Sequence, residues 1–535
     1  MELHEAVKQH GGKRAAARAL GIPESTLRDQ LKRERQAAMR SFVLPKALEA
    51  HRHTDRTTHF IITAAQDKTE IHEDFWNNLQ AYAGYLGAEI MIGGFTYSKK
   101  LFEENDPRVR SEHVWFDNRI EDRVMHDPIK LADQLIFCAE MNTLPTAVQP
   151  LSGLDSYTGS KWGIFPHAKY QLRTIATMKD ALSKQIMTTG AVTLPNYIRK
   201  KAGVKAQFHH IIGAIVVSVA PDGAFWCRPI QANDLVDGSF YDLDRFVAKG
   251  KITTGHRPEA LVCGDIHREK LDPTVALTTW GFDVETGEVN PNLPSLSNML
   301  RPKRRIYHDL TDFSARNHHN IKDHHFRYKL HHSTKGQDSV KADLMMSASF
   351  LKLTSDADIQ DVVIQSNHDN ALLKWVKTAD AKLDPENYEF WLECELRCIR
   401  AYREGRDPFL YEEVMRDLTG PLPNTIFVEE DSSYMVADVE LAIHGHYGAN
   451  GARGSAGAFN KMGPKSITAH THSPSVTDGH TCVGVNGLMD MGYNVGLSSW
   501  LHCDALLYPN GKRALIVMMH GRWFDPSTAQ SSLDF

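Results

Sequence analysis

Five short apolar runs in the second half of the chain each end in side chains that bind metal ions. The runs cover residues 260–267, 305–312, 362–369, 441–446 and 467–472. The polar residues at their ends are Asp265, His267, Asp309, Asn367, His368, Asp369, His444, His446, His470 and His472. About four apolar residues followed by polar groups are typical of a buried strand that ends at a binding site. Because open α/β sheets place their sites at the carboxyl ends of the strands, the runs predict one shared metal site.

The donor types in these runs favour a catalytic metal site over a structural one. Carboxylates, imidazoles and an amide are present, and the only cysteine of the runs, Cys263, precedes the ligands. A donor set without thiolate favours Mn, Fe or Zn in a catalytic role. Two divalent ions that share a carboxylate can polarise a phosphoryl group and lower the pKa of a bound water. The competing interpretation is that these are ordinary histidines, since the chain has 28. This interpretation can explain any single residue, but it explains the ordered set poorly.

The order of the runs resembles the motif order of the calcineurin-like metallophosphoesterases. That family carries D-x-H, G-D-x-x-D, G-N-H-D/E, a lone His and then G-H-x-H, and the similarity covers residues 256–525. Ser366, Ala469 and His308 stand where the family has glycine. The resemblance implies an α/β fold, namely a four-layer metallophosphoesterase β-sandwich flanked by helices.

The resemblance also implies a site for two divalent metal ions, with Mn expected first and Fe, Zn or Mg as alternatives. The implied ligands are Asp265, His267 and His472 at the first ion, Asn367, His444 and His470 at the second, and Asp309 as the bridge. His446 is an alternative to His444, which we prefer because it directly ends its apolar run. His368 would protonate the leaving oxygen, with Asp369 orienting it.

A basic segment near the amino terminus is the second informative feature. Residues 8–40 hold nine Lys or Arg residues against three Asp or Glu residues. An alanine-rich helix stopped by Gly21, and a second helix with Leu27 and Leu31 on its buried face, resemble a helix-turn-helix. The residues it would offer to DNA are Ser25, Thr26, Arg28, Lys32 and Arg33. The alternative is a basic helical hairpin that serves oligomerisation.

The rest of the chain divides into further expected parts. Residues 1–40 form the helix-turn-helix head, 41–57 a linker, 58–255 an α/β domain, 256–525 the phosphoesterase domain and 526–535 a tail. In the α/β domain we expect strands over 59–66, 88–94, 133–138 and 214–219 and a helix over 74–86. A helix between two successive strands is typical of a parallel α/β layer. A helical insertion is expected at about 371–416, with its apolar residues, including Leu392, Leu396, Ile399 and Tyr402, in the core.

Composition limits the class of protein. The chain has 535 residues, a net charge of −5 and 42% hydrophobic residues, which is ordinary for globular proteins. It has no apolar run long enough to span a membrane and begins without the segments of a secretory signal. Its seven cysteines, an odd number, favour a reducing cytoplasm over a disulfide framework. We therefore expect a cytoplasmic protein, in the host cytoplasm if it is encoded by a phage.

Additional cationic residues near the motifs are candidate phosphate contacts. They are Arg316 and His318 after the second motif and Arg453 in a glycine-rich loop after His444. The basic tract at 301–305 could follow a polyanion, although charge runs are more often solvated faces.

The two signals combine into one functional hypothesis. The arrangement also resembles tailed-phage proteins linked to DNA transfer and to host-DNA breakdown early in infection. A metal-dependent nuclease that hydrolyses DNA phosphodiester bonds is the function we predict, with DNA as partner and a homo-oligomer expected. The alternatives are a phosphatase or small-molecule phosphodiesterase, and a DNA-binding regulator without catalysis.

Overall fold

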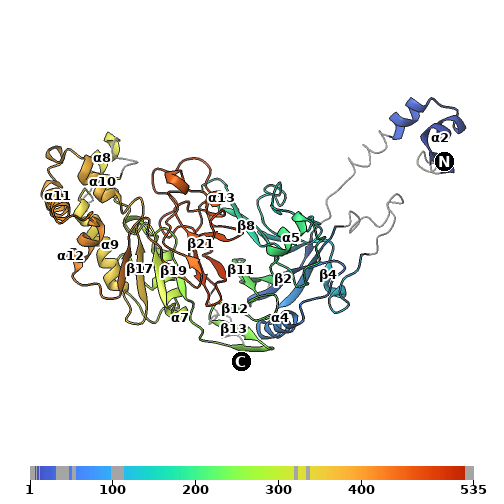
Figure 1. Cartoon of the computed structure of the whole chain (residues 1–535), viewed down its shortest axis with the longest axis horizontal. Helices are drawn as coiled ribbons and strands as arrows, with labels where there is room; N and C mark the ends of the chain where they lie inside the picture. The colour runs from blue at the N-terminus through green and yellow to red at the C-terminus, as the bar shows by residue number, and fades with distance from the viewer. Residues whose placement is uncertain are drawn as a thin grey trace. The chain divides into compact units, whose positions relative to one another are not determined.

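The structure, a computed structural model, describes residues 6–7, 9–10, 12–31, 47–50, 56–97, 114–179, 181–317, 323–332 and 338–524 (Figure 1). Its residue contacts group into two units, Met1–Ala47 and Leu48–Phe535. The tail expected at 526–535 lies outside the described residues. None of the described helices is long and apolar enough to cross a membrane.

The amino-terminal unit contains the two helices that the sequence predicts. They are α2, Lys13–Ala19, and a helical stretch over residues 24–31. Gly21 separates them with a φ of 68°, a left-handed conformation that suits glycine. The small core of this unit comprises Ala6, Ala16, Ala17, Leu27 and Leu31. The apolar spacing therefore predicted this packing correctly.

The second unit contains a five-stranded sheet. Its order is β11 (Phe225–Gln231), β10 (Gly213–Val219), β2 (Thr58–Gln66), β3 (Glu89–Phe95) and β4 (Val124–Met125). Strands β2, β3 and β4 are parallel, and α4 (Glu73–Leu86) connects β2 to β3. The strand–helix–strand pattern is confirmed. A three-stranded sheet of β12 (Phe240–Asp242), β13 (Arg245–Ala248) and β14 (Lys251–Thr253) follows.

A six-stranded sheet carries three of the five motif runs. Its order is β18 (Thr425–Val428), β17 (Gln360–Ile364), β16 (Arg304–Tyr307), β15 (Ala260–Val262), β24 (Cys503–Leu507) and β25 (Arg513–Val517). The first four strands are parallel, and β24 and β25 are antiparallel to their neighbours. The carboxyl ends of β15, β16 and β17 therefore share one edge.

An eleven-stranded sheet crosses the boundary expected near residue 255. Its order is β1 (Leu48–Glu49), β5 (Pro128–Ala132), β6 (Leu135–Cys138), β7 (Trp162–Phe165), β9 (Lys184–Thr188), β8 (Gln171–Ile175), β22 (Ser475–Thr477), β23 (His480–Cys482), β21 (Lys465–Thr468), β20 (Val439–Glu440) and β19 (Met435–Val436). Antiparallel pairing of β8 with β22 joins its two halves. β1 also ties part of the expected linker to β5. The two expected domains thus share a sheet, and the boundary between them stays a prediction.

Helices occupy the connections between the strands. They are α5 (Lys201–Phe208), α6 (Pro273–Trp280), α7 (Leu296–Leu300), α8 (His324–His331), α9 (Val340–Thr354), α10 (Ala371–Thr378), α11 (Tyr388–Arg403), α12 (Leu410–Thr419) and α13 (Ala456–Phe459). Short 3-10 turns are η1 (Glu121–Arg123), η2 (Arg268–Lys270), η3 (Ser314–Arg316), η4 (Ala381–Leu383) and η5 (Ala449–Gly451).

The helical character expected for 371–416 is confirmed, but part of its expected core is not. Leu392, Leu396, Ile399 and Tyr402 on α11 are exposed. The opposite face of the same helix buries Cys394 and Cys398. Helical spacing identifies which residues share a face, but it does not identify which face the rest of the chain covers.

Candidate metal centre

All five motif runs deliver their polar side chains just beyond the carboxyl end of a strand. Asp265 and His267 follow β15, Asp309 follows β16, and Asn367 follows β17. His444 follows β20, and His470 and His472 follow β21. The predicted edge therefore exists, although it is built from two sheets.

The backbone is left-handed at four of these positions. The φ values of His267, Asp309, His470 and His472 are 47°, 43°, 70° and 57°. Non-glycine residues adopt this region rarely, at a cost of roughly 1–3 kcal/mol each, and such residues cluster at functional sites. The chain thus bends sharply at the residues whose side chains converge.

The first group of donors contains Asp265, His267, Asp309 and His472, all of them buried. His472 Nε2 lies 2.9 Å from Asp265 Oδ2 and 3.3 Å from His267 Nε2. His267 Nε2 lies 3.7 Å from Asp309 Oδ2. One atom from each residue can therefore reach a common point.

The second group contains Asp309, His444 and His470, so Asp309 belongs to both groups. His444 Nε2 lies 3.3 Å from Asp309 Oδ2 and 2.9 Å from Asn367 Oδ1. His446, the alternative, instead faces Glu430, with Nε2 2.8 Å from Oε1. The geometry therefore favours His444, and a shared carboxylate lies where a bridge between two ions requires one.

The donors fit a cation chemically. Both carboxylate oxygens of Asp265 are buried, and among the described residues no well-directed hydrogen bond reaches them, although His472 Nε2 lies 2.9 Å from Oδ2. Burial alone would raise the pKa of Asp309, but His444 and His368 hold that pKa well below its usual range. Buried carboxylates kept ionised this way are costly unless positive charge compensates them. Burial lowers the pKa of His470 to about 4, which leaves its imidazole neutral, the form that binds metal.

Asp312 orients two histidines at this site. Its Oδ1 lies 3.2 Å from Nδ1 of His267, and Lys270 Nζ holds its Oδ2 at 2.9 Å. A carboxylate on Nδ1 leaves Nε2 free to bind a metal, as in many metalloproteins. His368 Nδ1 lies 2.8 Å from the backbone carbonyl of Asp312. Because a carbonyl only accepts, Nδ1 carries hydrogen, and Nε2 is the nitrogen that can exchange a proton.

Asp369 has a different position from the one expected. Its carboxylate accepts hydrogen bonds from Ser366 Oγ, at 2.9 Å, and from the backbone N–H of Thr311, at 3.4 Å. It thereby joins the turns after β16 and β17. The hydrogen bond that orients the ring of His368 goes to Asp312 instead. The serine that replaces the family's glycine thus has a structural partner.

His308 replaces another glycine of the family pattern without displacing Asp309. Its side chain is fully buried, and its ring centroid lies 5.6 Å from that of His444. Burial lowers the pKa of His308 to about 3, so the ring is neutral beside the donors. The bulky residue is therefore accommodated next to the site.

Several residues near the donors were not predicted. Besides Asp312, they are Lys270, Tyr493 and Trp500. Trp500 packs edge-on against His472 with 4.2 Å between ring centroids, and Tyr493 lies 6.2 Å from Trp500. The second Asp of G-D-x-x-D could have identified Asp312, whereas no pattern marks the aromatic pair. Trp500 belongs to the loop 488–500, in which Ser498 pairs with Thr177 of the amino-terminal half.

Comparison with known proteins identifies a family to which the chain belongs. No protein-family model and no solved structure matches it. Protein A1 of Escherichia phage T5 is 35% identical over 475 residues, which are 87% of this chain and 82% of that protein. The chain belongs to the Protein A1 family. The match includes a large majority of both chains.

In this member of the Protein A1 family, Arg316 has a structural position that corrects the phosphate contact we expected. Arg316 is buried, and its guanidinium binds Asp384, with Nε 2.6 Å from Oδ2, and also Asp338. Its donors are therefore engaged by carboxylates. His318 lies outside the described residues, and Arg453 is exposed on the loop after His444, where its phosphate contact stays a prediction.

The basic tract at 301–305 is paired as well. Arg301 binds Asp356 and Asp358, and Lys303 and Arg304 bind Glu259. Arg305 is buried against Asp361. The tract is therefore part of the protein's own ion pairs and not a free polyanion track.

The residues expected to contact DNA are only partly described. Ser25 and Arg28 are exposed and Thr26 is half-buried, and Arg28 donates a hydrogen bond to Glu24 at 2.6 Å. Lys32 and Arg33 lie outside the described residues. These DNA contacts stay predictions.

Proposed function

We propose that this protein is a nuclease that uses two divalent metal ions to hydrolyse phosphodiester bonds in DNA. The observation that carries the proposal is that two groups of possible metal donors, all buried except the half-buried His470, share one carboxylate, Asp309. The two groups correspond to the ligand order of a calcineurin-like metallophosphoesterase, and we propose that residues 256–525 form its four-layer sandwich.

In the proposed reaction, the metal ions and the side chains of the protein have different roles. Two divalent ions, Mn in the first instance, would supply Lewis-acid activation of the phosphodiester and of water. The residues that would hold them are Asp265, His267, Asp309, Asn367, His444, His470 and His472. His368 would donate a proton from Nε2 to the departing sugar oxygen, while the Asp312 carbonyl fixes its ring. We therefore assign the orienting role to Asp312 in place of Asp369.

His368 suits the role of general acid. Burial lowers its pKa, but the carboxylates of Asp309 and Asp312 outweigh burial and raise that pKa above its ordinary value. The ring lies 4.7 Å from that of His267, between centroids, so it borders the donors. A protonated imidazole at this position can deliver its proton to a leaving group.

DNA is the proposed substrate because of the amino-terminal unit. Its excess of Lys and Arg suits contact with phosphates, and its two short helices fit a helix-turn-helix. Similarity to a phage protein supports a phage-related role for this chain. We propose that this role is the breakdown of host DNA early in infection, in the host cytoplasm. A head this small contacts few phosphates, so we also propose a homo-oligomer that gains affinity through several heads.

The test is hydrolysis by the full-length protein. Supercoiled and linear duplex DNA are incubated with Mn²⁺, with EDTA, and with His368→Ala as the variant. We expect cleavage with Mn²⁺ and none with EDTA, and a loss of about 10²–10⁴-fold in the variant, the usual contribution of a general acid. Intact DNA across a series of divalent ions would overturn the nuclease proposal.

A small chromogenic phosphodiester, assayed in parallel, separates the alternatives. Rapid cleavage of this compound with DNA untouched would identify a small-molecule phosphoesterase. DNA retention without hydrolysis of either substrate, with any metal, would identify a non-catalytic DNA-binding regulator.

A further inference from the structure

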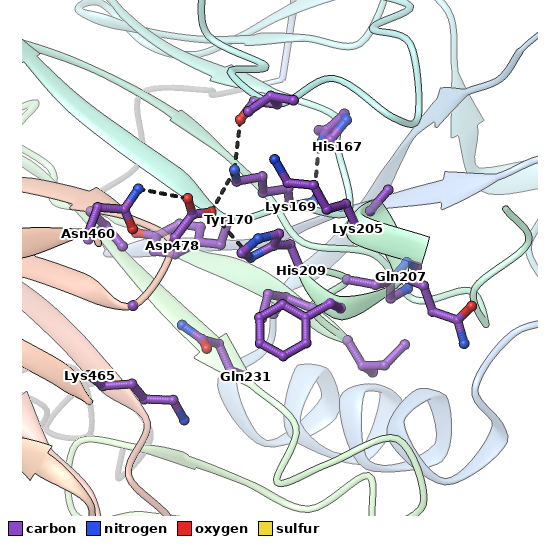
Figure 2. Close-up of a pocket in the computed structure, with 18 of the residues that line it drawn as sticks. His167, Lys169, Tyr170, Lys205, Gln207, His209, Gln231, Asn460, Lys465 and Asp478 are labelled. Carbon is purple, nitrogen blue, oxygen red and sulfur yellow. Dashed lines mark hydrogen bonds and ion pairs between the residues drawn. The ribbon is translucent and has the colours of Figure 1, made fainter. Parts of the chain in front are cut away.

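A large cavity lies apart from the metal centre. Its volume is about 1030 Å³, and its walls come from α5, the end of β11, the start of β21 and the turn between β22 and β23 (Figure 2). Lys465, at the start of β21, lines the cavity, whereas the metal donor His470 follows the other end of that strand. At about 3.3 Å per residue, β21 alone separates the two places by roughly 10 Å.

The cavity has a positive charge in a chain with a net negative one. Five Lys or Arg residues and two Asp residues line it, an excess of three positive charges, whereas the chain carries −5. The cationic residues are Lys169, Lys205, Lys465, Lys512 and Arg513. Clefts lined by charge of one sign concentrate ligands of the opposite sign.

Among the cavity cations, an ion pair within the described part of the chain neutralises Lys169. Asp478 Oδ1 lies 2.6 Å from Lys169 Nζ and 3.2 Å from His209 Nδ1 (Figure 2). Lys465, Lys512 and Arg513, which we call the basic triad, form no ion pair with any carboxylate in the described ranges. Arg513 donates instead to the backbone carbonyl of Gly479.

The basic triad is held in unfavourable surroundings. Burial, together with repulsion from Lys465 and Arg513, lowers the pKa of Lys512 to about 8. Burial lowers the pKa of Arg513 to about 10. Partly buried cations that repel one another are destabilising, and a bound anion removes that cost.

The wall formed by α5 and β11 has another chemistry. Phe208, at the end of α5, is 83% exposed, and Gln207 and Gln231 add amide groups. Figure 2 shows Gln207 and Lys465 on different sides, with Gln231 between them. Aromatic faces stack on nucleobases, and amides form hydrogen bonds with base edges. The cavity therefore combines anion recognition with features that recognise a heteroaromatic ring.

We propose that this cavity binds a phosphorylated nucleoside, with its phosphate on the basic triad and its base toward Phe208 and Gln231. A free nucleotide and the 5′-terminal nucleotide of a DNA strand share this chemistry. The site is separate from the proposed catalytic centre and does not depend on hydrolysis.

Calorimetric titration of the full-length, EDTA-treated protein tests the site. The ligands are deoxyadenosine 5′-monophosphate, deoxyadenosine and inorganic phosphate. We expect the nucleotide to bind more tightly than either fragment. Lys465→Ala combined with Lys512→Ala should weaken nucleotide binding roughly ten-fold or more, since a hydrogen bond to a charged group contributes about 1.5–3 kcal/mol. Lys461→Ala, an exposed lysine outside the cavity lining, is the matched control and should bind normally.

Two further measurements complete the test. Titration with oligonucleotides that carry a 5′-phosphate or a 5′-hydroxyl distinguishes the two ligands. If the site binds the end of a DNA strand, the 5′-phosphorylated oligonucleotide should bind more tightly. If the site binds a free nucleotide, the two oligonucleotides should not differ. Phe208→Ala, at an exposed position, should weaken binding of the nucleotide but not of phosphate, and it serves even if the double variant does not fold. The proposal would be overturned if the wild-type protein did not bind the nucleotide, or if both variants bound it as tightly as the wild type. Either result is independent of whether the protein hydrolyses DNA.

Discussion

At the scale of single residues, the candidate metal centre is organised around Asp309, whose charge its neighbours stabilise. This buried carboxylate contributes to both donor groups, and histidines surround it. Asp312 holds the Nδ1 atoms of His267 and His368, one through its carboxylate and one through its carbonyl. His267 and His368 are thus held in one tautomer and one orientation before any ion binds. Such fixed geometry favours ion binding because little reorganisation remains.

A pair of histidines two residues apart gives the first prediction. His444→Gln should lose bound metal and DNA hydrolysis, because His444 contacts Asp309 and Asn367. His446→Gln should keep both, because His446 faces Glu430. Metal content by elemental analysis and cleavage of plasmid DNA are the two measurements. Equal losses in the two variants would contradict our assignment of the ligand.

The protonation of His444 gives a pH prediction for the metal-free protein. Burial lowers the pKa of His444, but Asp309 and Asp265 outweigh it and raise the value from 6.5 to about 9. Between these values the folded state binds a proton that the unfolded state does not. The stabilisation is therefore complete below pH 6.5 and is lost as pH rises through about 9.

Thermal unfolding across this pH range checks the effect. With EDTA, the melting temperature of the wild-type protein should fall as pH rises from 6.5 to 9, and this fall should be smaller in His444→Gln. Metal affinity should rise over the same range because binding displaces the proton. A melting temperature that rises with pH in EDTA would contradict the account.

At the scale of elements, the strands under the site are held in place by a buried ion pair. Arg305 on β16 donates to Asp361 on β17, at 2.7 Å from Nε and 3.0 Å from Nη2, and both residues are buried. Asp309 and Asn367 follow the carboxyl ends of the same two strands. The sequence predicted these strands from their apolar runs, because a short apolar stretch before polar residues is a local signal. The sequence could not identify the pairing of Arg305, because Asp361 is distant in sequence. The basic tract at 301–305 also has the composition of a solvated surface.

Breaking this pair should be strongly destabilising. Arg305→Met leaves Asp361 buried without its partner, which typically costs about 3–5 kcal/mol. Arg301→Ala removes ion pairs whose side chains are partly exposed, and it should cost roughly 1 kcal/mol or less. Urea unfolding followed by circular dichroism measures both free energies. A smaller loss for Arg305→Met than for Arg301→Ala would refute the role we assign to the pair.

At the scale of the whole molecule, the candidate metal centre depends on segments far apart in the sequence. Pairing of β8 with β22 joins the amino-terminal half to the ligand-bearing half, and Thr177 anchors the loop that carries Trp500. Local patterns predicted the strands β2, β3 and β10 and the helix α4 within one or two residues. They could not predict that two expected domains share a sheet, because that pairing links residues about 300 positions apart. The α/β segment therefore has a part in building the site.

The amino-terminal unit should contribute DNA affinity and not chemistry. Deleting residues 1–47, the first contact unit, should weaken DNA binding and reduce its dependence on salt, since its Lys and Arg residues would contact phosphates. Hydrolysis of a small chromogenic phosphodiester should stay within about two-fold, because the donors lie in the second unit. Fluorescence anisotropy at several salt concentrations and a colorimetric assay are the measurements. Unchanged DNA affinity would rule out this role for the unit.

Anomalous scattering from crystals grown with Mn²⁺ tests the central claim most directly. We expect two peaks separated by about 3.5–4 Å, with Asp309 between them, as in two-metal phosphoesterases. Asp265, His267 and His472 should surround one peak, and Asn367, His444 and His470 the other. A single peak, or peaks away from Asp309, would contradict the two-metal centre and with it the proposed nuclease.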